Sequence, residues 1–299
     1  MGPSRANFQS GQPPPREGYV PVDNAELSYR EIGQGRPIIV IHGGPDLDRT
    51  YLLPDMDRLA DSYRLIYYDQ RGRGKSRGEL RLQDTGIEQY VEDLDSVRRY
   101  LQLDSVVILG HSWGGHVAMQ YALRHQDRGS HMILMNTAPA SHEDYLLMRE
   151  ERLRRRSAQE QQLNALVSSQ RYREGDPEAV AEYCRIDCGT AFKQPELIER
   201  LDLTATKEDV LRGREIENRL MEGLYWTEGF TIIPALEKLR TPTLIIHGDY
   251  DFVPVQCAIH TANAITGARL VIVDECGHFS YIEAPERVHK AIDEFFASA

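Results

Sequence analysis

The sequence has no apolar run long enough to cross a bilayer, which takes about 20 consecutive apolar residues in a helix. Its first 18 residues are polar and rich in proline, and they lack the apolar stretch of a secretory signal peptide. We therefore expect no membrane partner and no signal peptide. We interpret residues 1–18 as a flexible N-terminal tail.

Cysteine is also scarce, with only 4 residues in a chain of 299. They are Cys184, Cys188, Cys257 and Cys276. No two of them have the spacing of a zinc ribbon or of a redox-active C-x-x-C motif. The pattern favours reduced thiols in a cytoplasmic protein, and nothing in the sequence implies a metal ion or an organic cofactor.

Basic residues are outnumbered, 35 against 46 acidic residues, and the formal net charge is −11. Proteins that bind nucleic acid carry basic patches that face the phosphates, so this balance argues against a nucleic-acid partner. Hydrophobic residues make up 41% of the chain, which is ample for a buried core. The length predicts one large domain, or a core with an inserted subdomain.

Six short apolar runs, rich in β-branched residues, are typical of strands that are covered on both faces. They are Pro37–His42, Tyr63–Tyr68, Val106–Gly110, Met132–Asn136, Thr243–His247 and Leu270–Asp274. Helical patterns at Thr85–Leu103, Trp113–His125 and Pro285–Phe296 lie between or after them. This alternation predicts an α/β protein with a mostly parallel central sheet and helices on both faces.

The alternation stops between the fourth and fifth runs. Residues 139–239 contain long charged helical patterns, such as Glu143–Ser169 and Lys207–Gly223, and no convincing buried strand. A segment of this length is too long for a plain loop in a compact domain. We therefore predict a helical cap at 139–239, inserted into a core formed by 19–138 and 240–299.

The sharpest chemical signal is the sequence G-H-S-W-G-G at Gly110–Gly115. It directly follows one predicted strand and opens the helix at Trp113–His125. A G-x-S-x-G nucleophile elbow requires this context, because the glycines permit a tight turn that projects the serine hydroxyl clear of the backbone. We predict that Ser112 is a nucleophile, rather than a serine in an ordinary glycine-rich turn.

A serine nucleophile needs a base, and the base needs an acid that orients it. In proteins with this elbow the chain order is serine, acid, histidine. His278 lies in the loop after the sixth run, and Asp249 and Asp251 lie in the loop after the fifth. We predict that His278 is the base. We choose Asp251 as the acid because it lies farther into its loop, and Asp249 is the alternative.

The oxyanion that forms when the serine attacks needs two backbone donors. The N–H of Trp113, directly after the nucleophile, is the first. The second is expected in the loop after the first run, where Gly43 and Gly44 let the backbone approach a substrate closely. We choose Gly44, because Pro45 has no N–H to offer.

With these residues in view, the chain resembles the proline iminopeptidase branch of the α/β-hydrolase superfamily. The resemblance covers most of residues 35–298 and implies an α/β-hydrolase fold with a catalytic serine. It rests on the elbow and on four further motifs. These are H-G-G-P at His42–Pro45, D-Q-R-G-R-G-K-S at Asp69–Ser76, G-D-Y-D at Gly248–Asp251 and G-H at Gly277-His278.

Members of that branch bind the free amine of the substrate with cap carboxylates. Glu217-Asn218 resembles one of the motifs that supply them, although an exposed helix carboxylate is the alternative interpretation of Glu217. The second motif, Trp-x-x-Trp-Glu, is missing, and Asp187 is the only carboxylate in its place. The usual H-G-G-P-G motif is also altered, because Asp46 replaces its last glycine.

Because of these departures, we expect a serine hydrolase that cleaves small carboxylic esters through an acyl-enzyme intermediate. The alternative is a proline iminopeptidase that releases N-terminal proline from short peptides. A non-catalytic ligand receptor on a hydrolase scaffold is the alternative from another class, because a fold does not fix a function. Turnover of an aryl ester that is lost in Ser112→Ala would exclude the receptor.

Overall fold

A computed structural model describes residues 14–79 and 81–298. Its strands form one sheet in the order β1-β2-β4-β3-β6-β7-β8-β9, and β5 pairs with β2. The strands are β1 (Arg16–Val22), β2 (Ala25–Ile32), β3 (Arg36–Ile41), β4 (Tyr63–Tyr68), β5 (Arg77–Gly78), β6 (Val106–His111), β7 (Gly129–Met135), β8 (Thr243–Gly248) and β9 (Arg269–Val273). From β4 to β9 along this order every pairing is parallel, whereas β1, β2 and β5 pair antiparallel.

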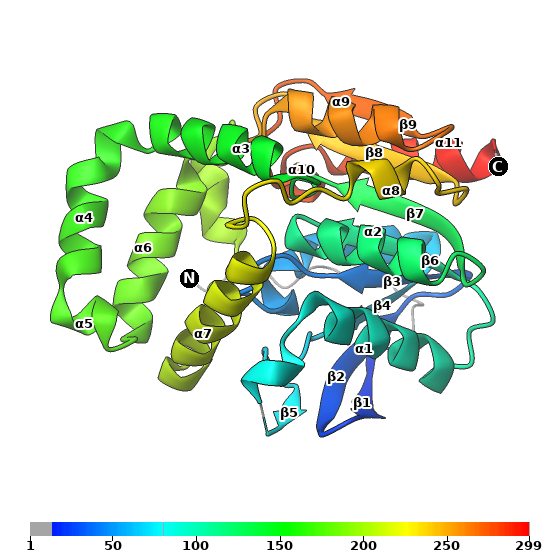
Figure 1. Cartoon of the computed structure of the whole chain (residues 1–299), viewed down its shortest axis with the longest axis horizontal. Coiled ribbons are helices and arrows are strands. Elements are labelled where there is room, and N and C mark those ends of the chain that lie inside the picture. The colour runs from blue at the N-terminus through cyan, green and yellow to red at the C-terminus, as the bar shows by residue number, and fades with distance from the viewer. Residues whose placement is uncertain (1–13, 80, 299) are drawn as a thin grey trace.

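Helices lie on both faces of the sheet and beyond its end (Figure 1). The α-helices are α1 (Ile87–Tyr100), α2 (Trp113–Arg124), α3 (His142–Arg155), α4 (Glu160–Ser168), α5 (Gln170–Arg173), α6 (Pro177–Gly189), α7 (Lys207–Gly223), α8 (Ile233–Leu236), α9 (Val255–Ala264), α10 (Ser280–Glu283) and α11 (Pro285–Ala297). Short 3₁₀-helices are η1 (Arg49–Leu52), η2 (Asp55–Asp61), η3 (Leu82–Asp84), η4 (Ser157–Gln159) and η5 (Pro195–Arg200). None of the described helices is long and apolar enough to cross a membrane.

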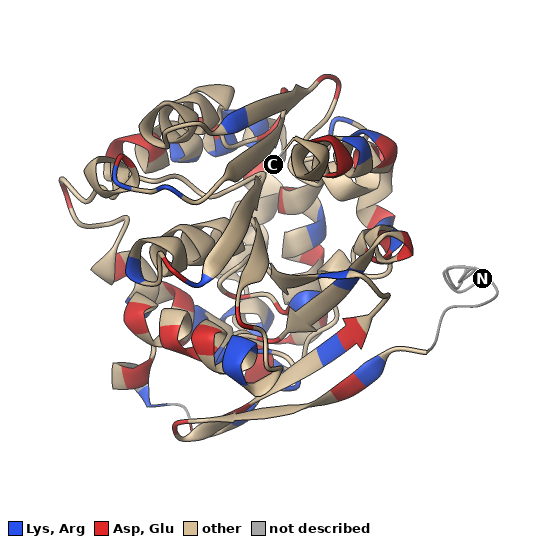
Figure 2. Ribbon diagram, turned by 90° about the vertical axis from the view of Figure 1, so that its right-hand side faces the viewer, with Lys and Arg blue, Asp and Glu red and all other residues tan. Residues whose placement is uncertain are grey.

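Two apolar cores, one on each face, hold the sheet in place. Successive side chains of a strand point to opposite faces, so Ile39 of β3 joins the core beneath α1 and α2, and Ile38 joins the core beneath η2 and α11. Every residue of β6 and β8 is buried. Charged residues are few on these central strands and frequent on the helices around them (Figure 2). The structure thus confirms the mostly parallel, doubly covered sheet.

The predicted flexible tail at residues 1–18 is too long, because the first strand begins at Arg16. Residues 1–13 of the predicted tail lie outside the described residues, but Arg16–Gly18 belong to β1. Arg16 lies opposite Glu31 of β2, and its guanidinium forms an ion pair with that carboxylate at 2.6 Å. Residues 16–18 are two charged residues and a glycine, which give no strand signal of their own, and they join β1 because β2 pairs with them.

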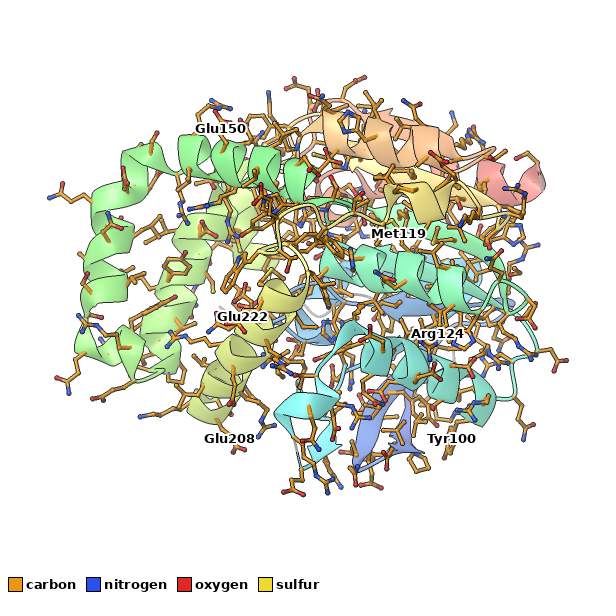
Figure 3. All side chains as sticks on the ribbon, viewed as in Figure 1. Tyr100, Met119, Arg124, Glu150, Glu208 and Glu222 are labelled. Carbon is orange, nitrogen blue, oxygen red and sulfur yellow. The ribbon has the colours of Figure 1, made fainter. Side chains whose placement is uncertain are left out.

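Helices α3 to α7 stand together at one side of the sheet in Figure 1, between β7 and β8 in the chain, and are called the cap below. The helix expected at Glu143–Ser169 is interrupted, because η4 separates α3 from α4. The two chain connections of this group lie side by side, where Ser141 and Thr231 form an antiparallel bridge. Glu150, Glu208 and Glu222 lie exposed on its outer surface (Figure 3).

A buried ion pair joins the loop after β4 to α1. Arg71 donates to both oxygens of Asp93, at 2.9 and 2.6 Å, and both side chains are 2% exposed. Removing one partner would leave the other charge buried without compensation.

We therefore predict that Asp93→Ala lowers the free energy of unfolding by about 3–5 kcal/mol. The matched control is Glu294→Ala, which removes a half-exposed ion pair with Arg269 of similar length, 2.7 Å. It should cost about 1 kcal/mol or less. Chemical denaturation followed by circular dichroism measures both. Equal losses in the two variants would contradict the prediction.

Candidate active site

Ser112 stands on the sharp turn between β6 and α2. Its backbone angles, φ 54° and ψ −121°, are strained for a residue with a side chain. The turn is possible because two of its residues are glycines, which have no side chain and can lie very close to neighbouring strands. A Cβ on Gly114 would overlap with the carbonyl oxygen of Ile41 in β3, and one on Gly115 would overlap with the side chain of Thr137 after β7. The predicted elbow is therefore present, between three adjacent strand ends.

Two cavities meet at Ser112, with volumes of about 330 and 320 Å³. The first is bounded by core and cap residues and carries many charged side chains. Its charged lining residues are Asp46, Arg73, Arg152, Arg156, Asp187, Arg214 and Glu217. The second is mainly apolar and aromatic, with Trp113, Tyr145, Met221, Tyr225 and Trp226 among its lining residues. Gly44 and Glu217 border both cavities.

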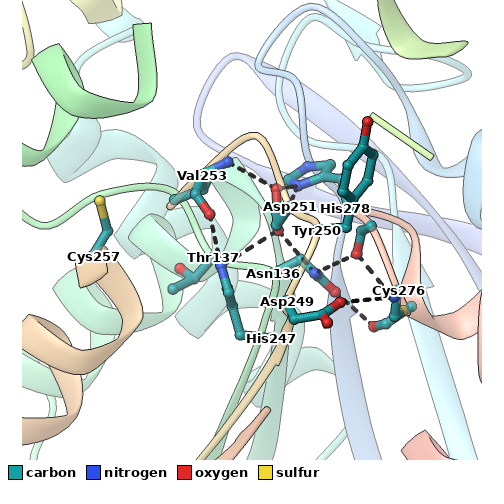
Figure 4. A network of polar contacts seen from close by, with 12 residues as sticks. Asn136, Thr137, His247, Asp249, Tyr250, Asp251, Val253, Cys257, Cys276 and His278 are labelled. Carbon is teal, nitrogen blue, oxygen red and sulfur yellow. Dashed lines mark hydrogen bonds and ion pairs between the residues drawn. The ribbon is translucent and has the colours of Figure 1, made fainter. Parts of the chain in front are cut away.

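His278 lines the first cavity together with Ser112 and contacts Asp251 behind it. The His278 Nδ1 atom lies 2.9 Å from Asp251 Oδ1 (Figure 4). Burial alone would raise the pKa of Asp251, but the His278 and His247 rings and the hydrogen bonds from His278 and the Val253 N–H lower it to about 2. An ionised carboxylate only accepts hydrogen bonds, so Nδ1 carries the proton and Nε2 is left free to accept one.

Asp249, the alternative acid, has a different partner. Its Oδ1 atom accepts a hydrogen bond from the N–H of Cys276 at 3.0 Å, and the residue is exposed (Figure 4). It therefore holds the loop of Gly277 and His278 against the loop after β8. The imidazole contacts Asp251 instead.

Asn136, directly after β7, is a residue of the site that the sequence did not identify. Its side-chain amide donates to Asp251 Oδ2 at 2.9 Å and to the Gly277 carbonyl at 3.1 Å. Its own oxygen accepts from the Ser280 hydroxyl at 2.6 Å. Asn136 thus satisfies the carboxylate oxygen nearest to it and fixes the loop of the base. Its position at a strand end was the only signal.

His111, next to the nucleophile, is a structural residue. Its Nδ1 atom lies 2.6 Å from the Tyr51 hydroxyl, and its Nε2 atom lies 3.0 Å from the carbonyl oxygen of His278. Burial, with the nearby His278 ring as a lesser cause, lowers the pKa of His111 to about 3. A ring that stays neutral and has both nitrogens engaged is a poor candidate for the base.

The N–H groups of Gly44 and Trp113, the two predicted oxyanion donors, are both available, whereas that of Gly43 is not. The N–H of Gly43 already donates to the Tyr51 hydroxyl at 2.7 Å, which leaves Gly44 as the glycine N–H of this loop that borders the cavities. Trp113 is the first residue of α2, where an N–H has no partner within the helix. Within the described chain, neither Gly44 nor Trp113 donates its N–H to another group of the fold.

The two predicted cap carboxylates lie in the same cavity in different states. Asp187 of α6 is buried and forms ion pairs with Arg152 and Arg156, the latter at 3.4 Å. Glu217 of α7 is partly buried and forms no ion pair or hydrogen bond with the described residues. Burial and the nearby Asp46 raise the pKa of Glu217 to about 7.

The cap is tied directly to the loop of the acid. Arg155 of α3 donates to the carbonyl oxygens of Tyr250 and Asp251, the second at 3.0 Å, and its guanidinium stacks on the Tyr250 ring at 4.1 Å. Arg73 makes a similar link, because it donates to the Asp209 carbonyl of α7 at 2.8 Å and to carbonyl oxygens of the loop after β3. Core and cap therefore position the site together.

These parts suit acyl transfer to serine: a projecting hydroxyl, an imidazole with a free Nε2, an ionised carboxylate behind it, and two unpaired N–H groups. Among the described residues no group of three or more His, Cys, Asp or Glu side chains is arranged to hold a metal ion.

Comparison with known proteins identifies the family and the fold. A family model for the alpha/beta hydrolase fold matches residues 36–285. The proline iminopeptidase of Saccharolobus solfataricus is 30% identical over 296 residues, with 93% of this chain and 91% of that protein covered. The proline iminopeptidase of Clostridium botulinum is 26% identical, with coverage of 93% and 97%. A thermophilic esterase from Thermogutta terrifontis has a TM-score of 0.69 at 26% identity, with coverage of 95% and 98%.

The geometry predicts how fast Ser112 reacts with an aryl phosphonate. Asp251→Asn should slow labelling at least about 1000-fold, because an amide can hold the imidazole in the wrong tautomer. The matched control, Asp249→Asn, should slow it less than about tenfold, because that carboxylate only supports a loop. Mass spectrometry of the labelled protein, with Ser112→Ala as the blank, gives both rates. The opposite ranking would assign the acid to Asp249.

Proposed function

Because the chain belongs to the alpha/beta hydrolase family, in its proline iminopeptidase-like branch, we propose that it is a serine aminopeptidase that releases proline from the N-terminus of short peptides. One observation carries the proposal: an unpaired, partly buried carboxylate, Glu217, borders both cavities that meet at Ser112. The free thiols at all four cysteines support a cytoplasmic location for this activity.

In the proposed mechanism Ser112 attacks the carbonyl carbon of the N-terminal residue. His278 Nε2 takes the proton of the hydroxyl, and Asp251 stabilises the imidazolium that results. The N–H groups of Gly44 and Trp113 stabilise the oxyanion of the tetrahedral intermediate.

Collapse of the intermediate breaks the peptide bond, and His278 returns its proton to the departing amine. Water then attacks the acyl-enzyme with His278 again as the base. The proline carboxylate leaves and the Ser112 hydroxyl is restored.

Glu217 explains how such a site selects a free amine. A carboxylate that has lost much of its hydration and has no internal partner is stabilised by an incoming ammonium group. A neutral ester offers no such compensation. Glu217 occupies the position that resembles the amine-binding Glu-Asn motif of the branch, and it lies on the cap side of the nucleophile.

The sequence alone ranked neutral esters first, because the Trp-x-x-Trp-Glu motif is missing. Relatives named proline iminopeptidases that match over nearly their whole length now support the peptide reading better. Hydrolysis of small esters is retained as a second activity. An aryl ester is a more reactive acyl donor that uses the same serine, and the esterase likeness supports it. The complete set of acyl-transfer groups argues against a non-catalytic receptor.

We predict that the protein cleaves prolyl 4-nitroanilide and that Glu217→Gln lowers kcat/KM for this substrate at least about tenfold, mainly through KM. The matched control is Glu215→Gln, an exposed glutamate on the same helix, which should change kcat/KM less than about twofold. Steady-state kinetics with the anilide and with a neutral 4-nitrophenyl ester measure the effect. Efficient ester cleavage without any anilide cleavage by the unmodified protein would disprove the peptidase proposal.

A second prediction concerns pH. The pKa of Glu217 is raised to about 7, so below that pH the carboxyl is mostly neutral and binds an ammonium poorly. The ratio of kcat/KM for prolyl 4-nitroanilide to that for the neutral ester should therefore rise with pH through about 7. The ratio removes the pH dependence of the acyl-transfer steps, which both substrates share. A ratio that stays constant from pH 5.5 to 8 would exclude Glu217 as the amine-binding group.

A further inference from the structure

Asp46, at the position where the branch usually has glycine, lines the cavity that contains Ser112. It follows Gly44 by two residues in the loop after β3, and its side chain lines the 330 Å³ cavity together with Ser112 and Glu217. In an N-terminal residue the amine nitrogen is only two bonds from the carbonyl carbon. A group on the loop that binds the carbonyl oxygen is therefore within reach of the amine.

Both carboxylates lack a partner within the described chain. Neither the Asp46 nor the Glu217 side chain forms an ion pair or a hydrogen bond there. They also interact with each other, since Asp46 is the second cause, after burial, of the raised pKa of Glu217. Two unpaired carboxylates that repel each other in one cavity are stabilised by a cation between them.

The guanidinium groups around the cavity are already engaged. Arg152 pairs with Asp187, and Arg73 donates to three carbonyl oxygens, one of them the backbone oxygen of Asp46. Arg214 donates to the carbonyl oxygens of Tyr172 and Arg173. Within the described chain, none of the three arginines lies within ion-pair distance of Glu217 or of the Asp46 carboxylate. These three guanidinium groups lower the pKa of Glu217 from a distance but form no ion pair with it, which leaves both carboxylates open to a direct contact with an external cation.

Asp187, the second amine ligand expected from the sequence, is in a different state. Two arginines neutralise it, and the ion pair with Arg152 is part of the cavity wall. An ammonium group would have to displace an arginine to reach it. Asp46 requires no such displacement.

We propose that Asp46 and Glu217 together form the ammonium-binding site, one carboxylate on the core and one on the cap, with the substrate amine between them. This inference rests on the proposed aminopeptidase function and assigns the second amine ligand to a loop of the core. The secondary ammonium of proline has two N–H donors, and two carboxylates satisfy both. A primary ammonium has three donors, so this site leaves one of them without an acceptor from the pair.

The test is Asp46→Asn, which keeps the size of the side chain and removes its charge. The ratio of kcat/KM for prolyl 4-nitroanilide to that for a neutral 4-nitrophenyl ester should fall at least about tenfold, mainly through KM of the anilide. The rise of this ratio with pH should also move to lower pH, because the carboxylate that raises the pKa of Glu217 is gone. Competitive inhibition by pyrrolidine should weaken in parallel.

The matched control is Asp202→Asn. Asp202 is an exposed carboxylate that borders a small neighbouring pocket with Asp46 but does not line the cavity of Ser112. It should leave the ratio within about twofold of the unmodified protein, because exposed charges are screened.

The outcomes separate the inference from the function on which it rests. Anilide cleavage by the unmodified protein, together with an unchanged ratio and pyrrolidine inhibition in Asp46→Asn, would overturn the role of Asp46 alone. An equal loss for anilide and ester in that variant would also overturn it, because it would show a general effect on the loop. Absence of anilide cleavage in the unmodified protein would instead overturn the proposed function and the inference with it.

Discussion

The turn at Ser112 is the constraint on which the rest of the structure depends. The turn brings the start of α2 close to the ends of β3 and β7. A side chain at Gly114 would overlap with Ile41, and one at Gly115 would overlap with Thr137. The strain of the positive φ at Ser112 is of order 1–3 kcal/mol, and the hydrogen bonds of its own N–H and carbonyl to Met135, Gly115 and Ala138 offset it. The sheet is rigid there because both of its faces are buried. The backbone from which the Ser112 hydroxyl projects is therefore fixed by the sheet.

The buried carboxylate of Asp251 organises the opposite side of the site. Burial of a charge is costly unless hydrogen bonds and opposite charges compensate for it. The compensation comes from three different strand ends: Asn136 after β7, the Val253 N–H after β8 and the His278 ring after β9. The same contacts that stabilise the charge therefore orient the His278 ring. Arg155 extends this organisation to the cap, because it binds the carbonyl oxygen of Asp251 itself.

The cavity at Ser112 is lined both by a carboxylate that has an ion-pair partner and by carboxylates that have none within the described chain. Asp187 is neutralised by two arginines, whereas Asp46 and Glu217 line the same cavity as Ser112 and form no ion pair within the described chain. The chain lacks the Trp-x-x-Trp-Glu motif of the branch that it resembles, and it carries a core carboxylate at Asp46. In the proposed aminopeptidase, the carboxylates without a counterion would therefore select the substrate.

The sequence by itself determined the buried strands, the elbow and the order of serine, acid and histidine, because each of these features is recognised from a short contiguous segment. The tertiary structure decided what depends on segments far apart in the chain. Strand β1 begins inside the predicted tail because β2 pairs with it. Asp251 rather than Asp249 meets the imidazole, although both lie in one loop, and Tyr51 takes the N–H of Gly43 and leaves that of Gly44. Arginines of α3 and its C-terminal end neutralise Asp187 and leave Glu217 unpaired. Backbone preferences are local, but the charge state and the partner of a side chain are set by contacts that only the folded chain creates.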